Sequence, residues 1–212
     1  MSPCSQLARR KVLSILFGLL AAPAMVLANN ATEEITPESF ATNYMASFGI
    51  HRFLLLNKIA GQIIMIDHGT IKGRFNALSG KKSGDDNKPY VTPAGVFPIL
   101  RSIDQSHPQS AMILSERGNK NYIAIHPVID IPGQNRRKRI QSSNPDSKRI
   151  SDGCINLTLD DYKTAADFTL EAMLFSSNGE IIRPAYLLVL PETTKLAEFP
   201  WPLNLPTPLK IP

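Results

Sequence analysis

The sequence has little cysteine, few aromatic residues and only a modest excess of positive charge. Two Cys among 212 residues cannot form a disulfide-rich scaffold. Aromatic residues make up 7%, which offers little of the aromatic surface of a nucleic-acid-binding domain. The formal net charge of +5 would suit such a partner, but part of it lies in N-terminal residues that are predicted to be removed. Apolar residues (43%) and charged residues (19%) occur at ordinary globular levels. This length and composition predict one folded domain with an additional segment.

The N-terminal residues have the three-part layout of a secretory signal peptide. Basic residues 9–11 precede an apolar run over 12–20, and small residues precede a cleavage point after Ala28. Pro23 interrupts the run before it reaches the roughly 20 apolar residues that span a bilayer, which disfavours an uncleaved anchor. We therefore predict that residues 1–28 are removed on export to the periplasm or cell-wall space.

Removal of this segment changes both the charge and the cysteine count. The segment contains three basic residues, no acidic residue and Cys4, so the mature chain has a net charge of +2 and one thiol, Cys154. A single Cys in an exported protein indicates either an intermolecular disulfide or a reactive thiol. A free Cys is also often a small buried apolar residue, so its local sequence has to distinguish these alternatives.

The mature chain divides into three parts. Residues 29–50 form a helical lead-in, whose helix begins after Thr36, and residues 192–212 form a Pro-rich tail. Between them, residues 51–191 contain short apolar runs separated by turn residues, followed by a helix with Thr158 as its N-cap. This pattern predicts a mainly β fold with one or two helices.

The chemistry is expected at the sequence Ser151-Asp152-Gly153-Cys154. Gly153 permits a sharp turn, and the main-chain amides of such a turn can point at one oxygen atom. A cysteine nucleophile acts as the thiolate and needs a neighbouring base. Asp152 is unsuited because its negative charge raises a thiol pKa, so His126, at the end of a predicted strand, is the candidate base.

Residues 151–156 resemble the signature S/T-H-G-C-x-N/R of the L,D-transpeptidase catalytic domain family, also called YkuD-like. Residues 92–97 are similar to the T-P-x-G-x-F element of this family, and residues 122–126 to the strand that carries its catalytic histidine. Residues 52–80 resemble the opening hairpins. The resemblance extends over about residues 52–190.

The resemblance implies a β-sandwich with a helix after the catalytic cysteine, and acyl transfer on peptidoglycan stem peptides. Cys154 would form a thioester and His126 would move the proton, while Ser151 orders the turn and the amides at Asp152, Gly153 and Cys154 bind the oxyanion. An amine of a second stem peptide, or of a wall-linked protein, would accept the acyl group. No metal, cofactor or nucleic acid is implied.

Two departures from the family pattern affect this expectation. Asp152 replaces the usual histidine, and the 27 residues between His126 and Cys154 form a longer link than is typical, so residues 130–148 are predicted to form a flap. Arg136, Arg149 and Asn156 are the candidate residues for binding substrate carboxylates; the alternative for the basic stretch 136–139 is a solvated loop.

Two other functions fit the same residues. One is hydrolysis by the same fold, as an L,D-carboxypeptidase or an amidase. The other is a non-catalytic wall-binding module, which the replacement at Asp152 suggests.

Overall fold

The computed structural model describes residues 35–101, 111–116 and 122–206. The predicted signal peptide, 1–28, lies outside the described residues. Three α-helices occur in the described part: α1 (Pro37–Ala46), α2 (Arg136–Ile140) and α3 (Leu159–Ala172), with a 3₁₀ helix η1 (Pro145–Lys148). The strands are β1 (Arg52–Asn57), β2 (Gln62–Asp67), β3 (Thr70–Asn76), β4 (Ser79–Gly80), β5 (Gly95–Arg101), β6 (Met112–Glu116), β7 (Tyr122–Pro127), β8 (Arg149–Ser151), β9 (Ile155–Leu157), β10 (Leu174–Phe175), β11 (Ile181–Arg183) and β12 (Ala185–Val189).

Eight strands form one mixed sheet in the order β3-β2-β1-β12-β5-β6-β7-β9. Hairpin pairing joins β1 to β2 in antiparallel register, whereas β1 and β12 are parallel. Strand β5 links the two halves of the sheet, because residues 95–99 pair with β12 and residues 100–101 pair with β6. The short strands β4 and β8 pair separately, as do β10 and β11.

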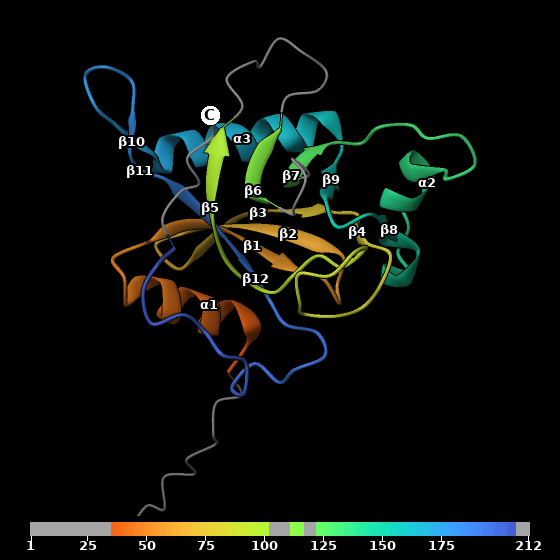
Figure 1. The fold of residues 1–212 in the computed structure, drawn as a ribbon, viewed down its shortest axis with the longest axis horizontal. Helices are drawn as coiled ribbons and strands as arrows, with labels where there is room; N and C mark the ends of the chain where they lie inside the picture. Colours follow the sequence, from red (N-terminus) through yellow and green to blue (C-terminus); the bar gives the residue numbers. More distant parts are fainter. Residues whose placement is uncertain (1–34, 102–110, 117–121, 207–212) are drawn as a thin grey trace, which may run out of the picture. The chain divides into compact units, whose positions relative to one another are not determined.

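Both faces of the central strands are buried, which explains their continuous apolar sequences. Leu54 and Leu56 of β1 face a core shared with β5, β6, β7, β9 and α3, while Phe53 and Leu55 face a second core that contains α1. This alternation follows from the two-residue period of a strand. Helices α1 and α3 therefore cover opposite faces of the sheet (Figure 1).

The predicted helix starts are confirmed by their capping hydrogen bonds. Thr36 Oγ1 accepts from the amide of Ser39 at 3.1 Å, and Thr158 Oγ1 accepts from the amide of Asp161 at 3.2 Å. The mainly β fold and the helix after the cysteine, α3, are confirmed as well. The short helix α2 adds to the one or two helices predicted, and it lies in the segment predicted to be a flap.

The described part of the Pro-rich tail packs against α1. Trp201 lies 5.2 Å from the ring of Tyr44, measured between centroids, and Tyr44 Oη donates to the carbonyl of Pro202 at 2.6 Å. Trp201 Nε1 donates to the carbonyl of Leu196 at 3.0 Å, so the polar N–H of the indole has a hydrogen-bond partner. The ring packs against the second core, the one that contains α1. The tail thus covers the lead-in helix.

A buried ionic cluster joins three distant segments beside β1. Lys58 is 2% exposed, and its Nζ donates to Asp85 Oδ1 at 3.0 Å and to the carbonyls of Gly84 and Thr92. Glu192 Oε1 lies 3.5 Å from the same nitrogen. Burial alone would raise the pKa of Asp85, but the hydrogen bonds from Thr193, the Glu192 amide and Lys58 hold it well below its ordinary value.

We expect Lys58→Met to lower the free energy of unfolding by about 3 kcal/mol, because two buried carboxylates would lose a shared cation. Urea denaturation followed by circular dichroism measures this change. Lys88→Met is the matched control: Lys88 pairs with Asp86 on the surface, and both side chains are 71% exposed. The control should leave the free energy of unfolding nearly unchanged, because solvent screens an exposed ion pair. Equal effects in the two variants would contradict a structural role for the cluster.

Candidate active site

The pairing of β7 with β9 brings the predicted base and the cysteine motif together. These strands are parallel, with Ile125 opposite Ile155 and His126 opposite Asn156. Cys154 directly precedes β9, so it lies at the start of the strand beside the one that carries His126. Parallel neighbours need a crossover connection, and here it is the long link that contains α2, η1 and β8.

The turn before Cys154 is held by its own hydrogen bonds. Gly153 has φ 127°, a conformation that favours glycine. Its amide donates to Ser151 Oγ at 3.1 Å, and Ser151 Oγ donates to the carbonyl of Cys154 at 2.5 Å. Ser151 is thus placed to order the turn. The Gly153 amide, which the sequence argument included among the oxyanion donors, is directed to Ser151 in this structure.

The side chain of Thr92 also holds the turn before Cys154. Its hydroxyl is buried, donates to the carbonyl of Gly153 at 2.8 Å and accepts from the amide of Gly80 at 2.9 Å. A Cβ at Gly80 would lie 2.4 Å from the carbonyl oxygen of Tyr90, so the close approach of these segments requires glycine. The sequence identifies residues 92–97 only as an element similar to the family, and no local pattern predicts this positioning role of Thr92.

His126 is held at both ring nitrogens. Nδ1 lies 2.7 Å from the carbonyl oxygen of Pro127, and Nε2 lies 2.9 Å from Nδ2 of Asn156. Burial lowers the pKa of His126; the hydrogen bond to Pro127 opposes that shift and the positive charge of Arg136 adds to it. The ring is therefore neutral at neutral pH, which is the state a general base needs.

Cys154 is half-buried, and its Sγ lies 3.6 Å from the carbonyl oxygen of Tyr122. Tyr122 begins β7 and His126 lies four residues further along the same strand, so this contact of the thiol is with the opposite end of β7 from the imidazole. Burial lowers the pKa of the Arg136 guanidinium, and its electrostatic interactions with Asp152 and Cys154 oppose that shift. The interaction with Cys154 is attractive when the sulfur is a thiolate.

The sequence matches the model of the L,D-transpeptidase catalytic domain, YkuD, over residues 51–181, which is more than half of the chain. The chain belongs to the L,D-transpeptidase catalytic domain family. The resemblance inferred from the cysteine motif, the Thr-Pro element and the histidine strand is thereby confirmed. No curated protein matches the sequence.

Solved L,D-transpeptidases are among the similar structures. The enzyme from Xylanimonas cellulosilytica is 15% identical, with 73% of this chain and 70% of that chain covered and a TM-score of 0.37. The Enterococcus faecium enzyme is 17% identical, with 66% and 50% covered and a TM-score of 0.39. The Mycobacterium smegmatis enzyme is 16% identical, with 66% and 58% covered and a TM-score of 0.35. The chain thus spans about half of the Enterococcus chain, and its family membership rests on the sequence match.

The residue that replaces the family histidine is directed to solvent. The side chain of Asp152 is 77% exposed, and its carboxylate lies 3.4 Å from Nζ of Lys81. Arg149, a candidate for substrate binding, is placed differently: its guanidinium forms an ion pair with the buried carboxylate of Glu192. The structure therefore places Arg149 in the cluster around Lys58 and Glu192.

Arg136 and Asn156, the other two candidates for substrate binding, lie together beside His126. Arg136 is 7% exposed and Asn156 is fully buried, and Arg136 Nη1 donates to Asn156 Oδ1 at 3.0 Å. The neighbouring Arg137 is exposed and pairs with Asp130. The basic stretch 136–139 is thus neither wholly a solvated loop nor wholly directed at substrate, because its first residue is packed inside.

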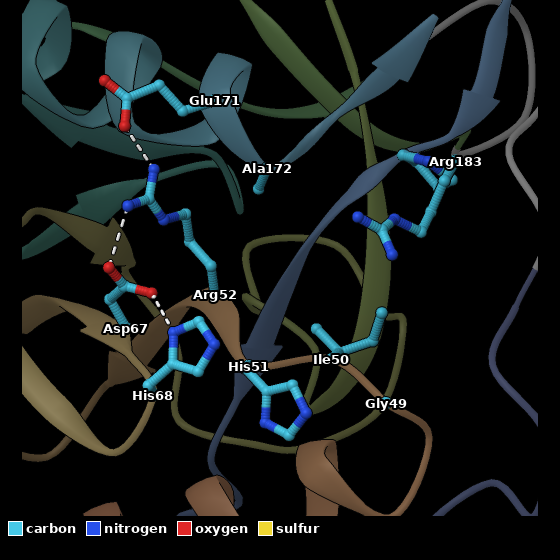
Figure 2. A pocket seen from close by; sticks show the side chains of 10 residues that line it. Gly49, Ile50, His51, Arg52, Asp67, His68, Glu171, Ala172 and Arg183 are labelled. Carbon is cyan, nitrogen blue, oxygen red and sulfur yellow. Dashed lines mark hydrogen bonds and ion pairs between the residues drawn. The ribbon is translucent and has the colours of Figure 1, made fainter.

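A cavity of about 430 Å³ lies apart from these residues, between the start of β1, the end of β2 and the end of α3. Figure 2 shows Arg52 directed to the carboxylates of Asp67 and Glu171, while the ring of His68 contacts Asp67. The ring of His51 stacks on His68, with centroids 5.1 Å apart. These ion pairs balance the charge of Arg52, and none of the predicted site residues lines this cavity.

No helix in the described part of the chain is long and apolar enough to cross a membrane. Among the residues described, no group of three or more His, Cys, Asp or Glu side chains is placed to hold a metal ion.

Thr92→Val should loosen the cysteine turn, because the Gly80 amide and the Gly153 carbonyl would both lose a buried partner. We expect the free energy of unfolding to fall by about 1–3 kcal/mol and the rate of Cys154 alkylation by iodoacetamide to change with it. Thr70→Val, at an exposed position in β3, is the control. A normal alkylation rate and normal stability in Thr92→Val would show that the turn does not depend on this hydroxyl.

Proposed function

We propose that this protein is a cysteine-dependent acyltransferase that acts on peptidoglycan stem peptides. The supporting observation is the register of β7 and β9, which sets His126 opposite Asn156, two residues after Cys154. Membership of the L,D-transpeptidase family supplies the substrate class. The predicted export of the mature chain, after removal of residues 1–28, would bring it to this substrate.

In the proposed reaction, the thiol proton passes to Nε2 of His126 as Sγ attacks the peptide carbonyl. Nε2 first exchanges its contact with the Asn156 amide for the thiol. The imidazolium that forms is stabilised through Nδ1 by the Pro127 carbonyl, 2.7 Å away. Collapse of the tetrahedral intermediate breaks the peptide bond, and His126 returns the proton to the leaving amine. The product is a thioester at Cys154.

The oxyanion of the intermediate forms next to the turn 151–154. We assign its stabilisation to the amides of Asp152 and Cys154, while Gly153 contributes the conformation of the turn, since its own amide donates to Ser151. One well-directed donor of this kind contributes about 3–4 kcal/mol to lowering the barrier.

The second half of the reaction needs an acyl acceptor. An amine of a neighbouring stem peptide, or of a lysine on a wall-linked protein, would attack the thioester and transfer its surplus proton to His126. The C–S bond would then break, and the proton would pass from His126 to the Cys154 sulfur. With water as acceptor, the same site would act as an L,D-carboxypeptidase or amidase. A module that only binds the wall would form no thioester.

We predict that the mature protein forms a covalent adduct at Cys154 with a carbapenem or a stem-peptide mimic. Intact-protein mass spectrometry measures this adduct, and analysis of the peptide products with and without an added amine separates transfer from hydrolysis. Cys154→Ala should form none. His126→Ala should slow adduct formation about 100-fold, because the thiol loses its base.

His68→Ala is the matched control, because His68 is an exposed histidine that lines the cavity beside Arg52, away from the proposed site. It should acylate at the wild-type rate. Absence of any adduct in the wild-type protein would contradict the enzyme and favour the wall-binding module.

A further inference from the structure

A chain of hydrogen bonds runs from the long link into the base of the proposed site. Arg136 Nη1 donates to Asn156 Oδ1 at 3.0 Å, Asn156 Nδ2 lies 2.9 Å from His126 Nε2, and His126 Nδ1 lies 2.7 Å from the Pro127 carbonyl oxygen. We propose that Arg136 is a positioning residue that, through Asn156, favours the tautomer of His126 in which Nε2 is unprotonated. This inference rests on the proposed function, because it concerns the general base of that reaction.

Arg136 determines the orientation of the Asn156 side-chain amide. A guanidinium has only donors, so the side-chain atom of Asn156 that faces Arg136 must be the acceptor Oδ1. The amide nitrogen then necessarily faces His126. Without a neighbouring cation, the oxygen and nitrogen of an asparagine amide can exchange places by rotation, and the hydrogen-bond network alone decides between the two orientations.

The orientation of the Asn156 amide in turn determines which nitrogen of His126 carries the hydrogen. The amide nitrogen of Asn156 can only donate, so Nε2 of His126 must carry the lone pair. At the other side of the ring, the Pro127 carbonyl can only accept, so Nδ1 carries the hydrogen. Both neighbours therefore require the same tautomer, and in it the lone pair lies on Nε2, the nitrogen that takes the thiol proton in the proposed reaction.

Burial strengthens the preference for this orientation of Asn156 and this tautomer of His126. Asn156 is fully buried and Arg136 is 7% exposed, so water is a poor substitute for either partner. Gln134 Oε1 accepts from Arg136 Nε at 2.6 Å, which fixes the plane of the guanidinium. The charged and titratable groups that interact with this cluster are Arg136 itself, His126, Cys154 and the exposed Asp152.

Arg136 belongs to α2, within the link that is longer than is typical of the family. Its neighbour in the same helix, Arg137, points to solvent and pairs with Asp130. The two arginines are adjacent in sequence, but Arg136 is buried and Arg137 is exposed. They therefore provide a test variant and a matched control that remove the same charge.

NMR spectroscopy of the mature protein, with ¹⁵N-labelled histidine and without substrate, tests the proposal. In the wild type, Nε2 of His126 should show the shift of an unprotonated nitrogen at pH 7.5, and the pKa should lie below the ordinary value of about 6.5. Arg136→Met lets the Asn156 oxygen turn toward Nε2 and compete with the Pro127 carbonyl for the ring hydrogen. It should therefore increase the population with a hydrogen on Nε2, raise this pKa and lower the rate of Cys154 alkylation about tenfold. Arg136→Lys should restore part of each effect, and Arg137→Met should change none.

An unchanged tautomer and an unchanged pKa in folded Arg136→Met would overturn the proposal. Asn156→Asp provides a second measurement should Arg136→Met fail to fold. The new carboxylate would accept from both Arg136 and His126, so Nε2 should gain a proton and the pKa of His126 should rise. An Nε2 that stays unprotonated at pH 7.5 in this variant would also overturn the proposal.

These spectra are recorded without substrate, so the two proposals fail separately. If the wild-type protein forms no adduct at Cys154 while Arg136→Met changes the tautomer, then the enzyme proposal is wrong and the positioning role stands. If the adduct forms at the same rate in the wild type and Arg136→Met, and the tautomer is unchanged, then only the positioning role is wrong.

Discussion

The parallel pairing of β7 with β9 is the constraint on which the site depends. It sets His126 opposite Asn156 and places Cys154 at the entry to the neighbouring strand. A register shift of one residue would turn Asn156 away from the imidazole, because side chains alternate between the faces of a sheet. The pair of strands lies at the edge of the sheet, and the backbone of Asn156 is tied on its other side to Leu78 by two hydrogen bonds of 2.9 and 3.0 Å. These two hydrogen bonds hold β9 in register with β7, although β9 is the last strand of the sheet.

The same region contains buried charge, which is costly unless its hydrogen bonds are satisfied. Arg136 has its bonds to Asn156 and Gln134, and Lys58 has its bonds to two carbonyls and Asp85. Both cations connect segments that are distant in sequence. Arg136 ties the long link to β9, whereas the Lys58 cluster ties the loop before β5 to the segment after β12. Through Glu192, this second cluster also reaches Arg149, two residues before Ser151. The position of the cysteine turn is therefore stabilised by both clusters.

Local patterns in the sequence were sufficient to predict the long strands and the helices α1 and α3, and they selected Cys154 and His126 as the two residues proposed to react. Thr36 and Thr158 have the side-chain and spacing signals of helix N-caps, and the apolar runs of β1 and β2 have turn residues between them. The positions of Arg136, Arg149 and Thr92 could not be predicted in this way. Their partners lie 20, 43 and 61 residues away, and a run of four basic residues ordinarily faces solvent. Family resemblance did not help with Arg136, since the link that carries it is longer than is typical of the family.

The replacement of the family histidine by Asp152 is best understood together with Arg136. A carboxylate next to a cysteine disfavours the thiolate, but its effect depends on the medium between the charges. Asp152 is 77% exposed and lies 3.4 Å from Lys81, so water and a neighbouring cation screen it. Arg136 is buried, where the same unit charge acts through a medium of lower dielectric constant. Arg136 also interacts electrostatically with both Asp152 and Cys154, so the buried cation and the exposed carboxylate partly balance each other beside the thiol. The long link thus brings to the cysteine turn a positive charge that Asp152, in place of the family histidine, does not provide.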